Sequence, residues 1–183
     1  MGVEGKIENL LYHNYFLGSH SRESAKKIFQ PPVSPQKPYY SVNVLSKIFP
    51  ESAPAGSESV LVHCPVPDLR CKKDWADKEI LADEIIKDMS EQSGFDVRRN
   101  MRALKILTPE DWADYLNLYR GSGLGLCHDI FQVGALRPAN RDEKLKNLYY
   151  VGASTIPGTG LPMVVICSKL VTERINREQE FLS

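Results

Sequence analysis

The residues best suited to chemistry lie in one glycine-rich turn near the C-terminus, from Gly152 to Pro162. The turn follows the apolar run 148–151, which predicts a strand buried on both faces, and Pro162 fits the first turn of a helix that continues to about Arg177. The N–H groups and the positive dipole end of such a helix favour a phosphate or an electron-rich ring edge. From these residues alone, a plain strand–helix turn remains the alternative to a cofactor contact.

The helix after this turn begins with the apolar run 163–166, which we expect to be buried all round. Its β-branched residues leave a strand as the weaker alternative. The turn lacks the full dinucleotide-binding fingerprint, because Gly158-x-Gly160 would need a third glycine where Met163 stands. Any cofactor contact here would therefore differ from that fingerprint.

A second glycine-rich stretch, 121–125, also fails the dinucleotide test. It follows a predicted helix, and neither a lysine nor the dinucleotide spacing accompanies it. We expect its glycines to permit tight backbone packing, with the border of a bound ligand as the alternative.

The cysteines indicate neither a metal site nor a disulfide framework. Six residues separate Cys64 from Cys71, which is not a common zinc or redox spacing, and Pro65 and Pro67 stiffen the chain between them. His63 leaves a metal site as the alternative, but buried or incidental thiols are the simpler interpretation. We expect no metal and a reducing compartment.

An aromatic stripe follows a clear helix start. Thr108 fits the N-cap position, Pro109 fits the first helical position, and two acidic residues follow in the first turn. Trp112, Tyr115 and Tyr119 then recur on one side at helical spacing. Such a stripe usually belongs to a core; the alternative is a wall against an apolar ligand.

The remaining pattern predicts short strands and helices upstream of this region. Strands are predicted at 13–17, 39–44 and 59–64, and about two helical turns at 23–29. A longer amphipathic helix is predicted at 74–92, with Asp74 as its N-cap and Gly94 at its end. The basic residues between 98 and 105 predict a strand with solvated side chains, or alternatively a patch for phosphate.

Composition is that of an ordinary globular chain. The 183 residues include 23 basic and 23 acidic residues, so the formal net charge is zero, and 42% are hydrophobic. These values argue against a disordered chain, a collagen, a disulfide-dense mini-protein and a generally basic nucleic-acid binder. We expect no nucleic acid as a partner. The sequence shows no signal peptide and no apolar run near the roughly 20 residues of a membrane span, so we expect no secretion.

Six ordered motifs resemble the phytoene desaturase family, the bacterial and fungal type of FAD-dependent carotenoid desaturase. The segment 152–162 resembles the family's C-terminal FAD-binding signature, which is Gly-Ala, then Thr-His-Pro-Gly-x-Gly-x-Pro, then an apolar helix. Upstream, the matching motifs are Tyr12-His13-Asn14-Tyr15-Phe16, Ser52-Ala53-Pro54-Ala55-Gly56, Leu107-Thr108-Pro109-Glu110-Asp111-Trp112, Tyr119-Arg120-Gly121-Ser122 and Leu136-Arg137-Pro138. The resemblance covers nearly the whole chain.

Two departures qualify this resemblance. Ile156 stands where the family usually has histidine, which removes a titratable group near the expected flavin. The family also begins with a glycine-rich βαβ unit for the ADP part of FAD, and these 183 residues contain none. The resemblance thus implies a C-terminal part of a two-domain flavoprotein, of mixed α/β (α+β) class. We expect a partial substrate domain with a mixed sheet at 1–134, and the last strand and helix of a Rossmann-like FAD domain at 135–183.

By this resemblance, the function is FAD-dependent desaturation of a carotenoid precursor such as phytoene, with this chain as a partial enzyme. The implied cofactor is FAD, and the implied cofactor-binding residues are Gly152, Ala153, Ser154, Gly158, Thr159, Gly160, Leu161, Pro162 and Met163. Trp112, Tyr115 and Tyr119 are the candidates for a substrate wall. No catalytic acid or base is identified; Arg137 is the best polar candidate, although an arginine before proline more often anchors a loop.

The resemblance implies a lipophilic polyene as substrate, and peripheral membrane association or a cytoplasmic location. A homo-oligomer or a missing N-terminal segment would complete the protein. Two alternatives stay open: a non-catalytic remnant or interaction module, and a flavin oxidoreductase similar to retinol saturase.

Overall fold

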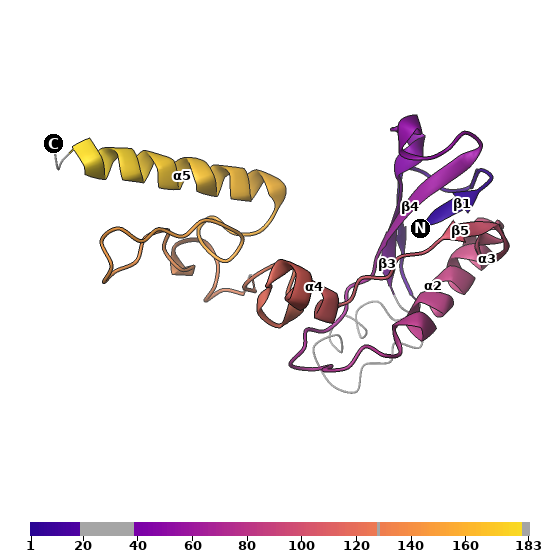
Figure 1. Cartoon of the computed structure of the whole chain (residues 1–183), viewed down its shortest axis with the longest axis horizontal. Helices are drawn as coiled ribbons and strands as arrows, with labels where there is room; N and C mark the ends of the chain where they lie inside the picture. Colours follow the sequence, from indigo (N-terminus) through magenta and orange to yellow (C-terminus); the bar gives the residue numbers. More distant parts are fainter. Residues whose placement is uncertain (19–38, 128, 181–183) are drawn as a thin grey trace. The chain divides into compact units, whose positions relative to one another are not determined.

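The computed structural model describes residues 1–18, 39–127 and 129–180 (Figure 1). Its residue contacts divide the chain into two compact units, Met1–Tyr115 and Leu116–Ser183, which are described separately below. The expected division after residue 134 concerns roles in a larger flavoprotein and stays a prediction. The short helix predicted at 23–29 lies outside the described residues.

The first unit contains a five-stranded sheet in the order β2-β3-β4-β1-β5. Its strands are β1 (Gly2–Glu4), β2 (His13–Phe16), β3 (Tyr40–Val44), β4 (Ser57–His63) and β5 (Met101–Ala103). The three strands predicted upstream are confirmed as β2, β3 and β4. All four strand pairs among the described residues are antiparallel, so the mixed sheet that we expected is wrong for this part of the chain.

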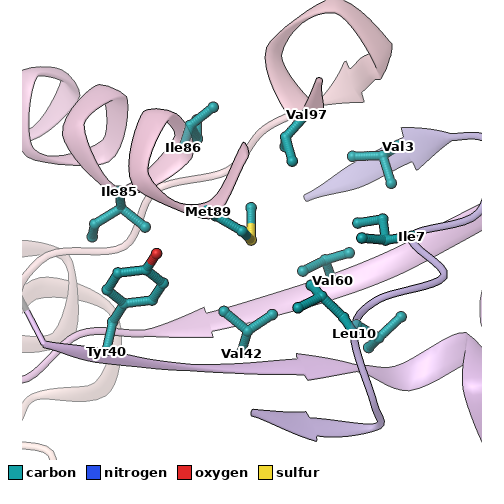
Figure 2. Close-up of a cluster of buried hydrophobic side chains, with 11 residues drawn as sticks. Val3, Ile7, Leu10, Tyr40, Val42, Val60, Ile85, Ile86, Met89 and Val97 are labelled. Atoms are coloured by element: carbon teal, nitrogen blue, oxygen red, sulfur yellow. The ribbon is translucent and has the colours of Figure 1, made fainter. Parts of the chain in front are cut away.

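Helix α2 (Lys78–Ser93) covers one face of this sheet. Ile85, Ile86 and Met89 are buried against apolar side chains of β3 and β4, as Figure 2 shows. Gly94 ends the helix with φ of 69°, as expected, and donates its N–H to the carbonyl of Ser90.

The predicted start of α2 is wrong. Asp74 does not cap the helix; its carboxylate accepts the N–H of Ala76 at 2.8 Å and closes a turn before it. The helix begins four residues later, at Lys78. An aspartate that bonds the backbone two residues on forms a local turn that competes with the helix.

The basic stretch after α2 forms a short helix, α3 (Val97–Asn100), and then β5. A continuous strand was expected there. The Asp96 side chain accepts the N–H of Arg99 at 2.9 Å and so nucleates the helical turn. Arg98 pairs with Asp83, and Arg102 donates to Glu4 at 2.7 Å.

Helix α4 (Pro109–Leu116) begins as predicted. Thr108 donates its N–H to the Asp111 carboxylate at 2.7 Å, and its hydroxyl accepts the Asp111 N–H at 3.3 Å, which forms a reciprocal cap. Hydrogen bonds from the backbone and the hydroxyl of Thr108 lower the pKa of Asp111. The core interpretation of the aromatic stripe is wrong for Tyr115 and Tyr119, each of which is 77% exposed.

The second unit contains helix α5 (Leu161–Glu180) and irregular backbone with the short 3-10 turns η3 (Tyr119–Gly121) and η4 (Gly134–Leu136). The predicted helix is confirmed and its strand alternative is wrong. The apolar start of α5 is not buried all round: Cys167 and Val171 are buried, but Val165 is 69% exposed. One face of the helix therefore packs, and the other stays open within this unit.

The strand predicted at 148–151 does not form. Tyr149 makes an isolated antiparallel bridge with Arg141, and Val151 is 54% exposed. A strand buried on both faces needs neighbouring strands and covering layers, and the described residues of this unit provide one bridge only.

Among the described residues, no helix combines the length and the apolar character needed to cross a membrane.

The two remaining 3-10 turns, η1 (Leu45–Lys47) and η2 (Pro50–Ser52), connect β3 to β4. Glu58 of β4 is buried beside them, where its carboxylate accepts the Ile7 N–H at 3.2 Å and lies 3.8 Å from the Lys47 ammonium. These contacts compensate the cost of a buried carboxylate.

Candidate cofactor-binding turn

The turn before α5 presents backbone N–H groups at the positive end of a 20-residue helix. The first hydrogen bond of the helix runs from the Val164 N–H to the carbonyl of Gly160 at 2.9 Å. The helix therefore provides no intrahelical acceptor for the N–H groups of Gly160, Leu161 and Met163, which come before Val164 in the chain. Pro162, in the same turn, has no N–H to contribute.

Glycine is required at several points of this turn by backbone conformation. Gly158 and Gly160 have φ of 129° and 114°, values that side-chain-bearing residues rarely adopt. A Cβ built on Gly160 would meet only the Met163 side chain, at 3.9 Å. The outer side of Gly160 is therefore open to an approaching group.

A buried arginine holds the start of the turn. The side chain of Arg137 is 3% exposed and donates to the carbonyls of Ala153 at 2.7 Å and Thr155 at 3.2 Å. The same guanidinium also donates to three carbonyls of a preceding loop, those of Leu126, Cys127 and Gln132, at 2.7 to 3.1 Å. All five contacts go to main-chain oxygens, so Arg137 joins two segments through their backbones.

A second buried cluster fixes the middle of the turn. The amide nitrogen of Asn140 lies 2.9 Å from the carbonyl of Ile156 and 3.1 Å from the Thr155 hydroxyl. The thiol of Cys167 on α5 lies 3.2 Å from the same amide nitrogen and accepts the Gly152 N–H at 3.4 Å. The turn is thereby attached to the helix that follows it.

The stretch 121–125 packs tightly against the turn, as predicted. Gly125 has φ of 70°, and a Cβ built there would lie 2.8 Å from the Ser154 hydroxyl and 3.2 Å from the Ala153 carbonyl carbon. Only glycine fits this approach without displacing Ala153 or Ser154.

The structure thus brings together part of the predicted set. Ala153 and Ser154 lie beside Gly125, and the Ala153 carbonyl accepts from the Arg137 guanidinium, whereas Gly152 donates its N–H to Cys167. The other predicted residues form the end of the turn and the first residues of α5: Gly158, Thr159, Gly160, Leu161, Pro162 and Met163. Their role in cofactor binding stays a prediction.

The three aromatic candidates do not share one helix. Trp112 and Tyr115 lie on α4 in the first unit, whereas Tyr119 lies beyond the helix in η3 of the second unit, where Arg120 stands 5.0 Å from its ring. The chain turns after α4 because Asn117 and Arg120 adopt positive φ. A common wall made by all three stays a prediction.

Sequence reasoning missed two residues of this site and understated a third. Nothing in the pattern around Asn140 or Cys167 indicated a polar cluster, because their partners are 10 to 27 residues away. The Arg137-Pro138 pair did indicate a loop anchor, and that interpretation is confirmed by its five carbonyl contacts.

A separate polar network joins the segment 141–149 to α5. The Tyr149 hydroxyl donates to Glu178 at 2.6 Å, and Arg141 stands 3.2 Å from the same carboxylate. The bond to Glu178 raises the pKa of Tyr149. This network ties the C-terminal half of α5 to the preceding segment.

The residues of the turn fit a flavin cofactor better than a metal. Backbone N–H donors, an open glycine and a helix dipole match phosphate or ring acceptors. Among the described residues, no group of three or more metal-ligating side chains occurs.

Comparison with known proteins supplies the family relationship. No family model matches the chain. The zeta-carotene-forming phytoene desaturase of Myxococcus xanthus is 37% identical over 96% of this chain, and the phytoene desaturase of Fusarium fujikuroi is 36% identical over the same share. A lycopene-forming phytoene desaturase from a Paracoccus species is 32% identical over 94%. The matches cover 34%, 34% and 35% of these relatives.

The chain is therefore a homologue of part of the carotenoid desaturases, and it spans about a third of the length of these relatives.

Proposed function

We propose that this chain forms the flavin-contacting turn and part of the substrate domain of an FAD-dependent carotenoid desaturase. Homology across 96% of the chain to a phytoene desaturase carries this proposal. The open N–H groups at the start of α5 support it, because they suit an electron-rich cofactor. The proposed substrate is a lipophilic polyene precursor such as phytoene.

When bound, FAD would supply the oxidant: desaturation removes two hydrogens from a saturated bond of the polyene, one as a hydride that FAD would accept and one as a proton that would be released to solvent. The chain's own residues would bind and orient. The N–H groups of Gly160, Leu161 and Met163 would donate to the ring edge, and the positive helix end would favour negative charge there. Ala153 has no polar side chain, so Ser154 and the backbone would serve the ribityl and pyrophosphate.

An uncharged polyene is recognised by apolar surface. Met163 would extend the apolar wall beside the ring, and Trp112, Tyr115 and Tyr119 are proposed for the substrate side. A hydrocarbon of this kind partitions into lipid, so we propose peripheral membrane association for the whole enzyme. We propose no catalytic acid or base, since Arg137 is fully engaged with carbonyls.

A chimaera tests this function. The homologous third of the Myxococcus xanthus desaturase is replaced by this chain, and the chimaera is expressed in cells that accumulate phytoene. We expect products of longer conjugation, measured by chromatography and visible absorbance. The matched control carries Gly160→Val, which places a β-branched side chain at positive φ in the turn and should abolish the product.

One observation favours a second candidate, a non-catalytic interaction module. Helix α5 leaves apolar residues such as Val165 exposed, and an exposed apolar face is a surface that a partner can cover. A folded chimaera that binds FAD but forms no desaturated product would favour this module over the enzyme. A retinol-saturase-like oxidoreductase would be favoured by a chimaera that reduces a double bond instead of forming one.

A further inference from the structure

Arg137 is a buried cation whose side-chain contacts go to backbone carbonyls. Its five donors meet five carbonyl oxygens at 2.7 to 3.2 Å, and arginine has five N–H donors in total. Each donor is therefore used, and no carboxylate is among these partners. The five carbonyl dipoles stabilise the guanidinium but do not neutralise it. A unit positive charge therefore remains buried next to the turn.

The position of one of these carbonyls sets the direction of a neighbouring N–H. The Ala153 carbonyl points at the guanidinium, at 2.7 Å. In a planar trans peptide the C=O and the N–H point in opposite directions. The N–H of Ser154 therefore points away from Arg137, and Ser154 as a whole is an exposed residue.

The same residue also prevents the alternative orientation. A flipped Ala153–Ser154 peptide would aim an N–H at the buried guanidinium and remove one of its five acceptors. Leaving a donor of a buried charged group without a partner costs more than an ordinary lost hydrogen bond. The packing of Gly125 against Ala153 and Ser154 leaves little space for such a flip.

We propose that Arg137 is a positioning residue for the cofactor: it aims the Ser154 N–H outward as a donor, and its buried charge favours an anionic group of FAD beside that donor. This inference rests on the proposed function. It adds a residue that does not itself touch the cofactor, and it assigns the cofactor's anionic part to the Ser154 end of the turn.

The test measures FAD binding to the full 183-residue chain by backbone amide NMR. FAD is titrated into the unaltered chain, Arg137→Ala and Arg137→Lys, and riboflavin, which lacks phosphate, serves as the uncharged probe. We expect FAD to shift the Ser154 amide resonance of the unaltered chain. Arg137→Ala should weaken FAD binding at least tenfold and riboflavin binding much less. Arg137→Lys should keep most of the preference for FAD over riboflavin, because it keeps the charge.

Chemical rescue separates positioning from simple loss of folding. Millimolar guanidinium, added to Arg137→Ala, should occupy the vacated site and restore both the Ser154 amide shift and the FAD affinity, whereas equal concentrations of sodium ion should not. Amides in the C-terminal half of α5, which lies in the same unit as Arg137 but away from the turn, report whether the variant remains folded. If Arg137→Ala unfolds the second unit, the comparison of FAD with riboflavin on Arg137→Lys decides the question alone.

Two results would overturn the inference in distinguishable ways. Unchanged FAD affinity and an unchanged Ser154 amide in Arg137→Ala would remove the positioning role and leave the proposed function intact. FAD shifts absent from the whole segment 152–163 of the unaltered chain, even at millimolar FAD where weak binding still shifts amide resonances, would instead contradict the cofactor site itself.

Discussion

Two glycines of the second unit, outside the turn, show that a glycine can be required for space as well as for backbone conformation. Gly125 and Gly134 have similar positive φ values, 70° and 57°, but their surroundings differ. A Cβ on Gly125 meets Ser154 and Ala153 within 3.3 Å, whereas a Cβ on Gly134 meets nothing within 4 Å. Substituting each glycine in turn therefore separates the free-energy cost of placing a side chain at positive φ from the cost of a steric clash.

Gly125→Ala should destabilise the second unit more than Gly134→Ala. Positive φ alone costs an alanine about 1–2 kcal/mol, and this cost applies to both variants. The clash with the Ala153 backbone should add about 1–3 kcal/mol for Gly125→Ala, as overpacking does. Denaturant unfolding followed by amide signals of residues 126–180 measures both values. Equal destabilisation of the two variants would show that the close approach to Ser154 is not formed in solution.

At the scale of elements, α2 and the sheet make the core of the first unit. Met89 of α2 is fully buried among valines of β3 and β4 (Figure 2). Ile80 on the same helix is 64% exposed. Burial of apolar surface contributes roughly 25 cal/mol per Å², so these two residues should contribute very unequally to stability. Helix propensity alone would not distinguish them, since both would be replaced by alanine.

Met89→Ala should lower the free energy of unfolding of the first unit by about 2–5 kcal/mol, because it removes a buried side chain and leaves a cavity. Ile80→Ala, the control on the same helix, should change it by less than about 0.5 kcal/mol, as surface substitutions do. Urea unfolding followed by circular dichroism gives both values. A Met89→Ala effect as small as that of Ile80→Ala would contradict the packing of α2 on the sheet.

A hydrogen bond between α2 and β3 should make the stability of the first unit depend on pH. The buried Tyr40 hydroxyl donates to the Asp88 carboxylate at 2.7 Å. Burial, followed by this bond and the nearby negative charge, raises the pKa of Tyr40. A raised folded pKa means that this stabilisation is complete below the unfolded pKa of about 10 and is lost as pH rises above it.

Between pH 8 and pH values above about 10, the unaltered chain should therefore lose more stability than Tyr40→Phe. The substitution removes the titrating hydroxyl and keeps the ring, which stacks on Phe16 at 4.6 Å between centroids. Urea midpoints across this pH range measure the difference. Parallel pH profiles for the two proteins would show that the tyrosine does not titrate with a raised pKa in the folded state.

At the scale of the whole chain, the cofactor turn lies in a unit with little regular sheet of its own. The segment 148–151 forms one bridge instead of a strand, and the start of α5 exposes apolar side chains. The relatives are about three times as long as the matched region. We infer that further residues of a larger flavoprotein would cover these surfaces and hold most of the cofactor.

The purified 183-residue chain should for this reason bind FAD only weakly. Mixing with FAD followed by gel filtration should leave far less than one flavin per chain, read from flavin absorbance against protein concentration. The chimaera proposed above, purified in the same way, should retain flavin near one per chain. Stoichiometric flavin on the chain alone would contradict the need for additional residues.

The sequence by itself determined the elements whose signals are local. The alternation in 39–44, the Thr108–Pro109 start and the Gly94 end predicted β3, α4 and the end of α2, because strand pleating, capping and positive φ depend on neighbouring residues. The Arg137-Pro138 pair also indicated a loop anchor correctly. Resemblance to carotenoid desaturases could be read from six short motifs, and the comparisons confirmed it.

Only the tertiary structure decided which of these elements are buried and what holds the turn. The segment 148–151 looked like a buried strand, but burial depends on partners distant in sequence, and the described part of the second unit supplies only Arg141. The Arg137 carbonyl cluster and the Asn140–Cys167 contact join residues 5 to 27 positions apart. Such contacts form because a buried polar group must find a partner, and local pattern does not say which partner the fold will bring near.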